Sequence, residues 1–269
     1  MPSVERRHGW SWRPRLWRAK SEPGAAAGSL RIVRNTEATE DKARRRFAAG
    51  QRPAAAAGRA AQLDAVTVDA MGTLVELDEP VERLAQALAE WGVDRSPGDV
   101  AAAFRTEIEY YLANKLAARD EDALAELRRE CARVFLTAAE ADIDAGEFAP
   151  AFVSAMVFRP LDGAASALER LRAAGLALAC VSDWDIGLRD QLEAVGVAHL
   201  FALVLTSAEA GAPKPEPGLF GEALSRLGVA PKRVVHVGDG EADRVGADAA
   251  GIAFEPVPLA TVPERLGLR

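Results

Sequence analysis

Apolar residues recur every three to four positions over a long stretch of the chain, residues 79–158. Examples are the segments VERLAQALAEWG and EDALAELRRECARVFLTAAEA. This spacing places apolar side chains on one face of an amphipathic helix, and strand-like alternation is nearly absent. Pro97 directly follows Ser96, a pair that favours the start of a helix. The pattern therefore predicts a helical bundle in this region.

Short apolar, β-branched runs occur on both sides of this helical region. One run ends at Asp69, and the others cover residues 176–182, 201–207 and 233–239. Helical spacing covers residues 162–174, 185–196, 217–227 and 241–250. Strands that alternate with helices predict βαβ units and a parallel sheet. We therefore predict an α/β fold, with a Rossmann-like doubly wound parallel sheet and an inserted all-α domain.

Residues 1–60 show neither period. They combine the basic, tryptophan-bearing stretch RRHGWSWRPRLWRAK with tracts of small residues, proline and glycine. This composition predicts a disordered basic tail. The alternative is a peptide that binds a membrane surface or an acidic partner. The predicted organisation is a tail at 1–60, an α/β core at 61–76 and 159–269, and a helical cap domain at 77–158.

Charge and cysteine content limit the expected partners and compartment. The first 60 residues hold 14 basic and 5 acidic residues, a net charge near +9, so the remainder carries a net charge near −16. An acidic body disfavours nucleic acid. No run of about 18 apolar residues exists, so no membrane-spanning helix is expected. Cys131 and Cys180 lack metal-binding spacing and no apolar signal segment is seen, which favours a reducing, cytoplasmic compartment. We expect a monomer or homodimer that acts on a small molecule.

Polar residues follow the predicted strands at the points where these strands end. They are Asp69, Ser182, Asp183, Lys214, Asp239 and Asp243. Because reactive groups gather beyond the carboxyl ends of parallel strands, we expect these side chains to meet at one edge of the sheet. The lysine can neutralise developing charge, the hydroxyl can hold phosphate oxygens, and the carboxylates suit Mg²⁺. The sequence therefore predicts a site for a metal ion and an anionic substrate.

Four motifs carry a resemblance to the haloacid dehalogenase superfamily. In chain order they are VTVDAMGTL, LACVSDWD, GAPKPEPGLF and VGDGEADRVGADAAG, all between Ala65 and Pro256. Each motif is weak alone, but the four in this order form a specific signal. The resemblance implies a hydrolase with a helical cap inserted after the first motif. It further implies a Mg²⁺-dependent phosphatase that acts on a small phosphorylated metabolite through an aspartyl-phosphate intermediate.

The resemblance assigns roles to the matching residues. Asp69 is the expected nucleophile, and Thr73 supports its loop. Ser182 binds the transferring group, and Lys214 stabilises both Asp69 and the charge of the transition state. These four residues are the catalytic set that the resemblance implies.

The resemblance also assigns the metal ligands. Mg²⁺ is expected on Asp69, Asp239 and the backbone carbonyl of Met71. Asp243 is expected either as a further ligand or as a support, because its spacing from Asp239 is one residue shorter than in many relatives. The family's phosphatases place a general acid where this chain has Met71, and losing a positioned acid costs about 10²–10⁴ in rate.

Substrate contacts are expected from Ser182 and its neighbour Asp183, and from Arg105 and Tyr110 on a cap helix. Asp183 brings a carboxylate close to the phosphate, so it must be protonated, paired or turned away. We interpret His236 as a core histidine within a strand. We interpret Lys115, the one lysine of the helical region, as a solvated side chain.

Two other functions remain open from the sequence. A carbon–halogen hydrolase similar to 2-haloacid dehalogenases would not be impaired by Met71, because a halide leaves without a proton. A binding or regulatory protein with weak activity is the third possibility. If the chain is a phosphatase, another acid such as Glu76 or Glu107 could take the place of the missing one.

Overall fold

The computed structural model describes residues 58–268, and a five-stranded parallel sheet lies at its centre. The sheet order is β5-β4-β1-β6-β7, with every neighbouring pair parallel. The strands are β1 (Ala65–Val68), β4 (Ala177–Ser182), β5 (Leu203–Thr206), β6 (Val234–Gly238) and β7 (Ala253–Pro256). The predicted α/β fold with a doubly wound sheet is confirmed. The sequence patterns missed β7, because this edge strand is short and buries only one of its four residues well.

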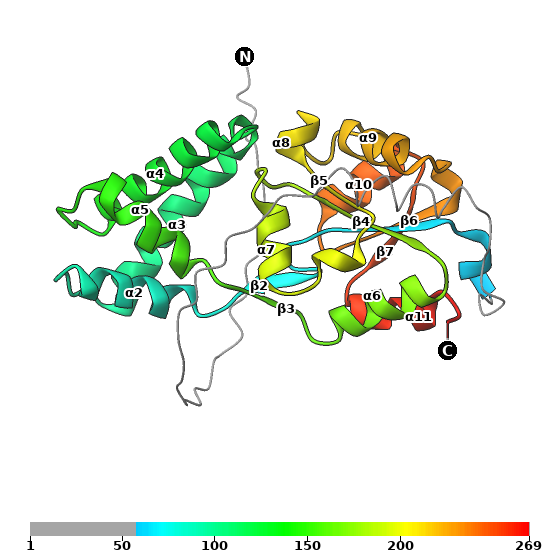
Figure 1. Cartoon of the computed structure of the whole chain (residues 1–269), viewed down its shortest axis with the longest axis horizontal. Helices are drawn as coiled ribbons and strands as arrows, with labels where there is room; N and C mark the ends of the chain where they lie inside the picture. Colours follow the sequence, from blue (N-terminus) through cyan, green and yellow to red (C-terminus); the bar gives the residue numbers. More distant parts are fainter. Residues whose placement is uncertain (1–57, 269) are drawn as a thin grey trace, which may run out of the picture. The chain divides into compact units, whose positions relative to one another are not determined.

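Helices cover both faces of the sheet (Figure 1). On one face lie α6 (Ala164–Ala173), α7 (Leu188–Ala194) and α11 (Val262–Arg265), and on the other lie α9 (Gly218–Leu227) and α10 (Glu241–Ala249). Successive strand residues point to opposite faces, so Val66 packs with α6 while Ala65 packs with α9. Since both faces are buried, the strands are continuous apolar runs. The remaining short elements are η1 (Gly58–Gln62), η3 (Ala198–Leu200), α8 (Ser207–Ala210), η4 (Pro231–Arg233) and η5 (Leu259–Thr261).

The helical region forms an insertion between two short antiparallel strands, β2 (Val75–Leu77) and β3 (Phe158–Pro160). It contains α2 (Pro80–Glu90), α3 (Pro97–Asn114), η2 (Lys115–Ala117), α4 (Glu121–Ala138) and α5 (Ala145–Ala155). These helices bury a hydrophobic cluster of their own, which includes Phe135 and Phe148. Ser96 caps α3 by accepting a hydrogen bond from the backbone N of Asp99, as its place before Pro97 predicted. We call residues 78–157 the helical insertion.

The predicted tail boundary at residue 60 falls inside η1. Residues 1–57 lie outside the described part of the chain, but η1 packs into the core. Ala60 is fully buried, and its backbone N donates to the carbonyl of Leu266 at 3.0 Å. Arg59 pairs with the carboxylate of Glu255. The alanine-rich composition suggested a tail. In the structure, the small side chain of Ala60 lets η1 pack closely against Leu266.

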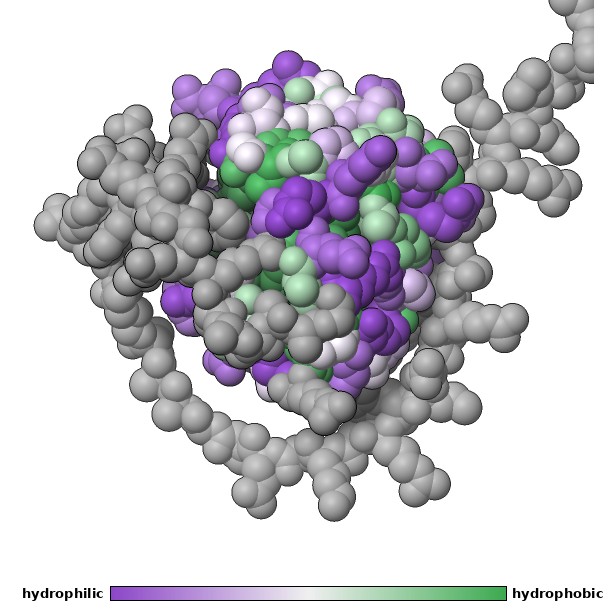
Figure 2. Space-filling model, turned by 90° about the vertical axis from the view of Figure 1, so that its right-hand side faces the viewer, coloured by the Kyte–Doolittle hydropathy of each residue, from purple (hydrophilic) through white to green (hydrophobic). Residues whose placement is uncertain are grey.

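The described residues contain no helix that is long and apolar enough to cross a membrane. Both cysteines are free and buried. On the face seen in Figure 2, hydrophilic side chains surround smaller hydrophobic areas. Ion pairs such as Arg170 with Glu264 and Arg244 with Glu241 are largely exposed, so each contributes little to stability.

Candidate active site

Asp69 lies directly after β1, where its backbone N donates to the carbonyl of Val237 on β6 at 2.9 Å. The residue is 6% exposed. The turn that follows contains Gly72 at φ +77°, and a Cβ at this position would lie 2.3 Å from Oδ2 of Asp239. Only glycine therefore allows the turn after β1 and the loop after β6 to lie so close together.

Two donors bind the same oxygen of Asp69. Lys214 Nζ lies 2.6 Å from Oδ1, and Ser182 Oγ, at the end of β4, donates to that oxygen at 2.9 Å. All three side chains are buried. Burial raises the pKa of Asp69, although the Lys214 charge acts in the opposite direction. Burial acts to lower the pKa of Lys214, but the charges of Asp69 and Asp243 outweigh it and raise that pKa.

Asp243, on α10, uses both carboxylate oxygens in hydrogen bonds. Its Oδ1 lies 2.6 Å from Lys214 Nζ and 2.9 Å from His236 Nε2, and its Oδ2 accepts from the backbone N of Gly240 at 3.2 Å. Burial acts to raise the pKa of Asp243. The hydrogen bond from His236 and the Lys214 charge outweigh burial and hold the pKa below its ordinary value. Asp243 is thus a carboxylate that fixes the lysine.

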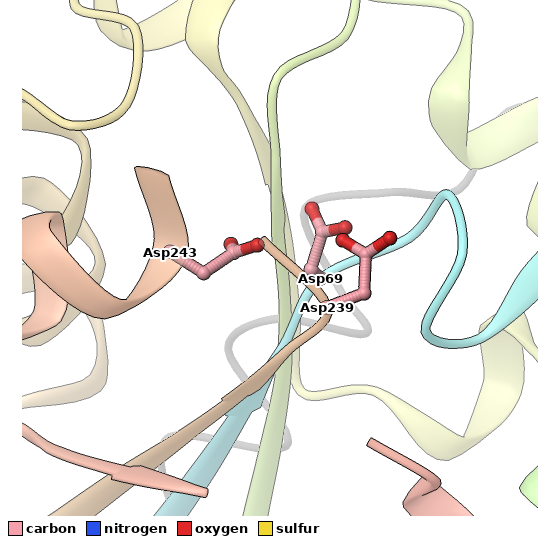
Figure 3. A group of neighbouring side chains, drawn as sticks. All are labelled: Asp69, Asp239 and Asp243. Atoms are coloured by element: carbon pink, nitrogen blue, oxygen red, sulfur yellow. The ribbon is translucent and has the colours of Figure 1, made fainter. Parts of the chain in front are cut away.

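Three carboxylates meet at this edge of the sheet. Asp69, Asp239 and Asp243 offer oxygens that all lie within 4.8 Å of one another (Figure 3). Burial and the neighbouring charges of Asp69 and Asp243 raise the pKa of Asp239 to about 6. One ammonium, that of Lys214, faces these three acids at hydrogen-bonding distance from two of them. The donor set is therefore short of positive charge and has the hard oxygen ligands that suit a divalent cation.

Asp183 is paired with the backbone of the loop that carries Lys214. Its Oδ1 accepts a hydrogen bond from the backbone N of Lys214 at 2.9 Å. The carboxylate that follows Ser182 therefore shapes the lysine loop. Of the alternatives expected for Asp183, pairing is the one the structure has.

Thr73 and Met71 occupy the turn after Asp69. Thr73 is 1% exposed, and its Oγ1 has no hydrogen-bond partner among the described residues. Met71 is partly buried and packs against the main core. Glu76 pairs with Arg159 across the β2–β3 hairpin, so this acid already has a cationic partner.

A model of the haloacid dehalogenase-like hydrolase family matches residues 63–251. The chain belongs to this family. The bovine (Bos taurus) haloacid dehalogenase-like hydrolase domain-containing protein 3 is 44% identical over 102 residues, which cover 38% of this chain and 41% of that protein. A phosphoserine phosphatase of Thermus thermophilus is 42% identical over 123 residues, 45% of this chain and 49% of that protein. The matched segments thus span less than half the length of these relatives.

The family fold is also seen in solved structures. A defluorinating L-2-haloacid dehalogenase superposes with a TM-score of 0.63 at 19% identity, covering 76% of this chain and 95% of that one. This likeness concerns the fold. The expected resemblance to the haloacid dehalogenase superfamily is confirmed.

Arg105 and Tyr110, which are expected to contact the substrate, lie on α3 of the helical insertion, as predicted. Arg105 is exposed on α3. Tyr110 packs against the hydrophobic cluster of the insertion, close to Glu130 and Arg133 of α4. Neither has a described hydrogen bond to a residue at the end of β1 or β4, so their substrate role stays a prediction.

Other residues of the insertion reach the core instead. Lys115 is 8% exposed, and its Nζ donates to the carbonyl of Asp183 at 3.0 Å, so the solvated interpretation was wrong. The Tyr111 hydroxyl donates to Oδ2 of Asp185 at 2.9 Å. Ile186, in the same core loop, packs against the hydrophobic cluster of the insertion. The helical spacing of the insertion could not predict these contacts, because the core loop after β4 is distant in sequence.

Proposed function

We propose that this hydrolase is a Mg²⁺-dependent phosphatase that acts on a small phosphorylated metabolite. One observation carries the proposal: Asp69 receives hydrogen bonds from Lys214 and Ser182, beside two further carboxylates. Positive charge and fixed donors at this position stabilise the charge that develops on a transferring phosphoryl group. The similarity to a phosphatase from Thermus thermophilus supports the same reaction class.

The proposed reaction has two steps. In the first, a carboxylate oxygen of Asp69 attacks phosphorus, the bond from phosphorus to the leaving oxygen breaks, and the leaving group departs with the electron pair. In the second, water attacks the aspartyl phosphate, inorganic phosphate leaves, and the carboxylate is restored. Because Ser182 and Lys214 both bind Oδ1, we assign the attack to Oδ2.

Asp69 and Asp239, whose carboxylate oxygens lie within 4.8 Å of each other, would hold Mg²⁺, together with the backbone carbonyl of Met71 that the family resemblance implies. Bound there, the ion would offset the excess negative charge and draw electron density from the phosphoryl oxygens. We assign Asp243 to the support of Lys214, because both of its oxygens already accept hydrogen bonds.

Met71 makes the proposed phosphatase sensitive to its leaving group. A thioether cannot donate a proton, so alkoxide leaving groups, which are strongly basic, should depart slowly. Aryl and acyl phosphates leave as stable anions and need little protonation. Glu107, considered above as a substitute acid, is 5% exposed inside the helical insertion and hydrogen bonded to Cys131. It therefore does not reach the leaving group in this arrangement.

The test measures phosphate release from esters whose leaving groups span a range of pKa, with Mg²⁺ and with a chelator. The expected wild-type rate depends on Mg²⁺ and falls steeply as the leaving-group pKa rises. Met71→Asp should raise the turnover of alkyl esters by about 10²-fold if the new carboxyl is well placed. Met71→Leu is the control, since it keeps an apolar side chain and adds no acid. A flat wild-type profile without rescue by Met71→Asp would exclude the missing-acid account.

A carbon–halogen hydrolase is the second candidate. Met71 favours it, because a halide leaves without a proton. The same panel should therefore include 2-haloacids. Halide release that persists with chelator, without phosphate release, would place the second candidate first. Absence of turnover in both assays would support a binding or regulatory role.

The cellular site and assembly are also part of the proposal. We propose that the chain acts in the cytoplasm, where two free, buried thiols are stable. We expect it to be a monomer or a homodimer. Size-exclusion chromatography with light scattering distinguishes these two states.

A further inference from the structure

His236 is a buried member of the site that the sequence suggested to be core packing. It lies in the middle of β6 and is 0% exposed. Its partner in the strand register is Thr67 of β1, two residues before Asp69. The His236 Nδ1 lies 2.9 Å from the Thr67 hydroxyl, and Nε2 lies 2.9 Å from Oδ1 of Asp243. Both ring nitrogens therefore have a polar partner.

The partners determine the direction of these hydrogen bonds. Asp243 accepts hydrogen bonds from Lys214 Nζ on Oδ1 and from the backbone N of Gly240 on Oδ2, so it acts as an acceptor toward His236 as well, and Nε2 of His236 carries the proton. Burial lowers the pKa of His236, which favours the uncharged ring. Nδ1 is then an acceptor, and the Thr67 hydroxyl donates to it. Two partners thus determine the tautomer of His236: Thr67 on the paired strand β1 and Asp243 on α10.

Packing holds the ring in this orientation. The Phe220 ring lies edge-on to the His236 ring at a centroid distance of 4.8 Å. A Cβ on Gly246 would lie 2.7 Å from Phe220, so α10 also packs tightly against this phenyl ring. An imidazole held by packing on its face and hydrogen bonds at both nitrogens has little freedom to reorient.

We propose that His236 is a positioning residue for the reaction, because its Nε2–H holds Asp243 in the orientation that keeps Lys214 on Asp69. The chain of contacts runs from Nε2 to Asp243 Oδ1, from that oxygen to Lys214 Nζ at 2.6 Å, and from Nζ to Asp69 Oδ1 at 2.6 Å. Without the donor on His236, the orientation of Asp243 depends only on Lys214 at Oδ1 and on the backbone N of Gly240 at Oδ2. The ammonium then loses a fixed position beside the nucleophile.

The inference rests on the proposed function for its effect on turnover. Lys214 acts on developing charge, so its displacement should lower kcat and leave KM nearly unchanged. Partners that orient metal-ligating residues contribute about 10- to 100-fold to activity, and we expect a loss of the same size here. A purely structural histidine would instead affect stability in proportion to how well its replacement packs.

Two substitutions separate these roles. His236→Gln keeps an N–H donor near the position of Nε2, whereas His236→Met keeps an apolar chain of similar size and removes the donor. The expected kcat of His236→Gln is within about threefold of wild type, and that of His236→Met is lower by about 10- to 100-fold with KM unchanged. If His236 serves only for packing, His236→Met should be the more stable and the more active variant, because methionine fills a buried apolar site better than an amide does. Melting temperatures of both variants show that the protein remains folded.

A second measurement does not depend on turnover. Nitrogen-15 NMR of the histidine rings in the full chain should show His236 protonated at Nε2 and unprotonated at Nδ1. The ammonium signal of Lys214, protected from exchange by two carboxylates, should be kept in His236→Gln and lost in His236→Met. A wild type without phosphatase activity but with this pattern would overturn the proposed function and uphold the hydrogen-bond chain. An Nδ1–H tautomer, or a folded His236→Met with unchanged kcat and Lys214 signal, would overturn the inference.

Discussion

Replacing Glu107 by glutamine should stabilise the protein, and more so as pH rises. Glu107 is 5% exposed on α3, within the hydrophobic cluster of the helical insertion. Burial raises its pKa from 4.5 to about 7, while a hydrogen bond with Cys131 acts in the opposite direction. The folded chain therefore holds the proton more tightly than the unfolded chain. Below pH 4.5, the carboxyl of Glu107 does not lower the free energy of unfolding. The loss grows as pH rises from 4.5 to about 7 and is complete above that pH.

The size of the effect follows from the difference between the two pKa values. A shift from 4.5 to about 7 corresponds to about 3 kcal/mol of lost unfolding free energy at high pH. At about pH 5.5 the same pKa shift lowers the unfolding free energy by only about 1 kcal/mol. Glu107→Gln removes the ionisable proton but keeps a polar group beside Cys131. Its gain over wild type should therefore be larger by about 2 kcal/mol at about pH 8.5 than at about pH 5.5.

The assay is urea unfolding of the full chain, followed by far-ultraviolet circular dichroism at both pH values. Glu109→Gln is the matched control, since Glu109 is exposed two residues further along α3. Its effect should stay within about 0.5 kcal/mol at either pH. A gain for Glu107→Gln that is equal at the two pH values, or a loss at the higher one, would refute the burial argument.

Three further predictions concern the site and the chain start. Asp69→Asn should abolish turnover and leave the melting temperature within error, because the amide cannot act as the carboxylate nucleophile. Gly72→Ala should lower kcat at least about 10-fold and raise the Mg²⁺ concentration needed for half-maximal rate, because its Cβ would displace Asp239. Removing residues 1–62 should cost about 1 kcal/mol of unfolding free energy relative to removing residues 1–57, because η1 contributes a buried residue and a backbone hydrogen bond.

Each of these three has an outcome that contradicts it. Wild-type turnover by Asp69→Asn would remove the covalent mechanism. Gly92→Ala is the control for Gly72→Ala, since it shares φ +77° but has no atom within 4 Å of its Cβ. Equal loss of activity in the two glycine variants would mean that backbone strain, not the contact with Asp239, is responsible. Equal stability of the two truncated chains would show that η1 adds nothing to the core.

The sequence by itself determined the fold class and grouped the main residues of the candidate site. Apolar runs that alternate with helical spacing require a parallel sheet with helices on both faces, because each run must be buried on two sides. Parallel strands bring their carboxyl ends to one edge, so Asp69, Ser182 and Asp239 could be grouped from their positions alone. These inferences depend on local periods and on topology, which a single sequence carries.

Tertiary structure decided which of these groups bind one another. The pairing of Thr67 with His236 depends on strand register, and the contact of His236 with Asp243 depends on how α10 follows β6. Lys115 was placed in solvent by its helical period, yet a core loop far away in sequence buries it. The role of Asp243 also required coordinates, since the direction of its oxygens, and not its spacing, identifies its partners. Contacts between elements distant in sequence leave no periodic signal, so only the folded chain specifies them.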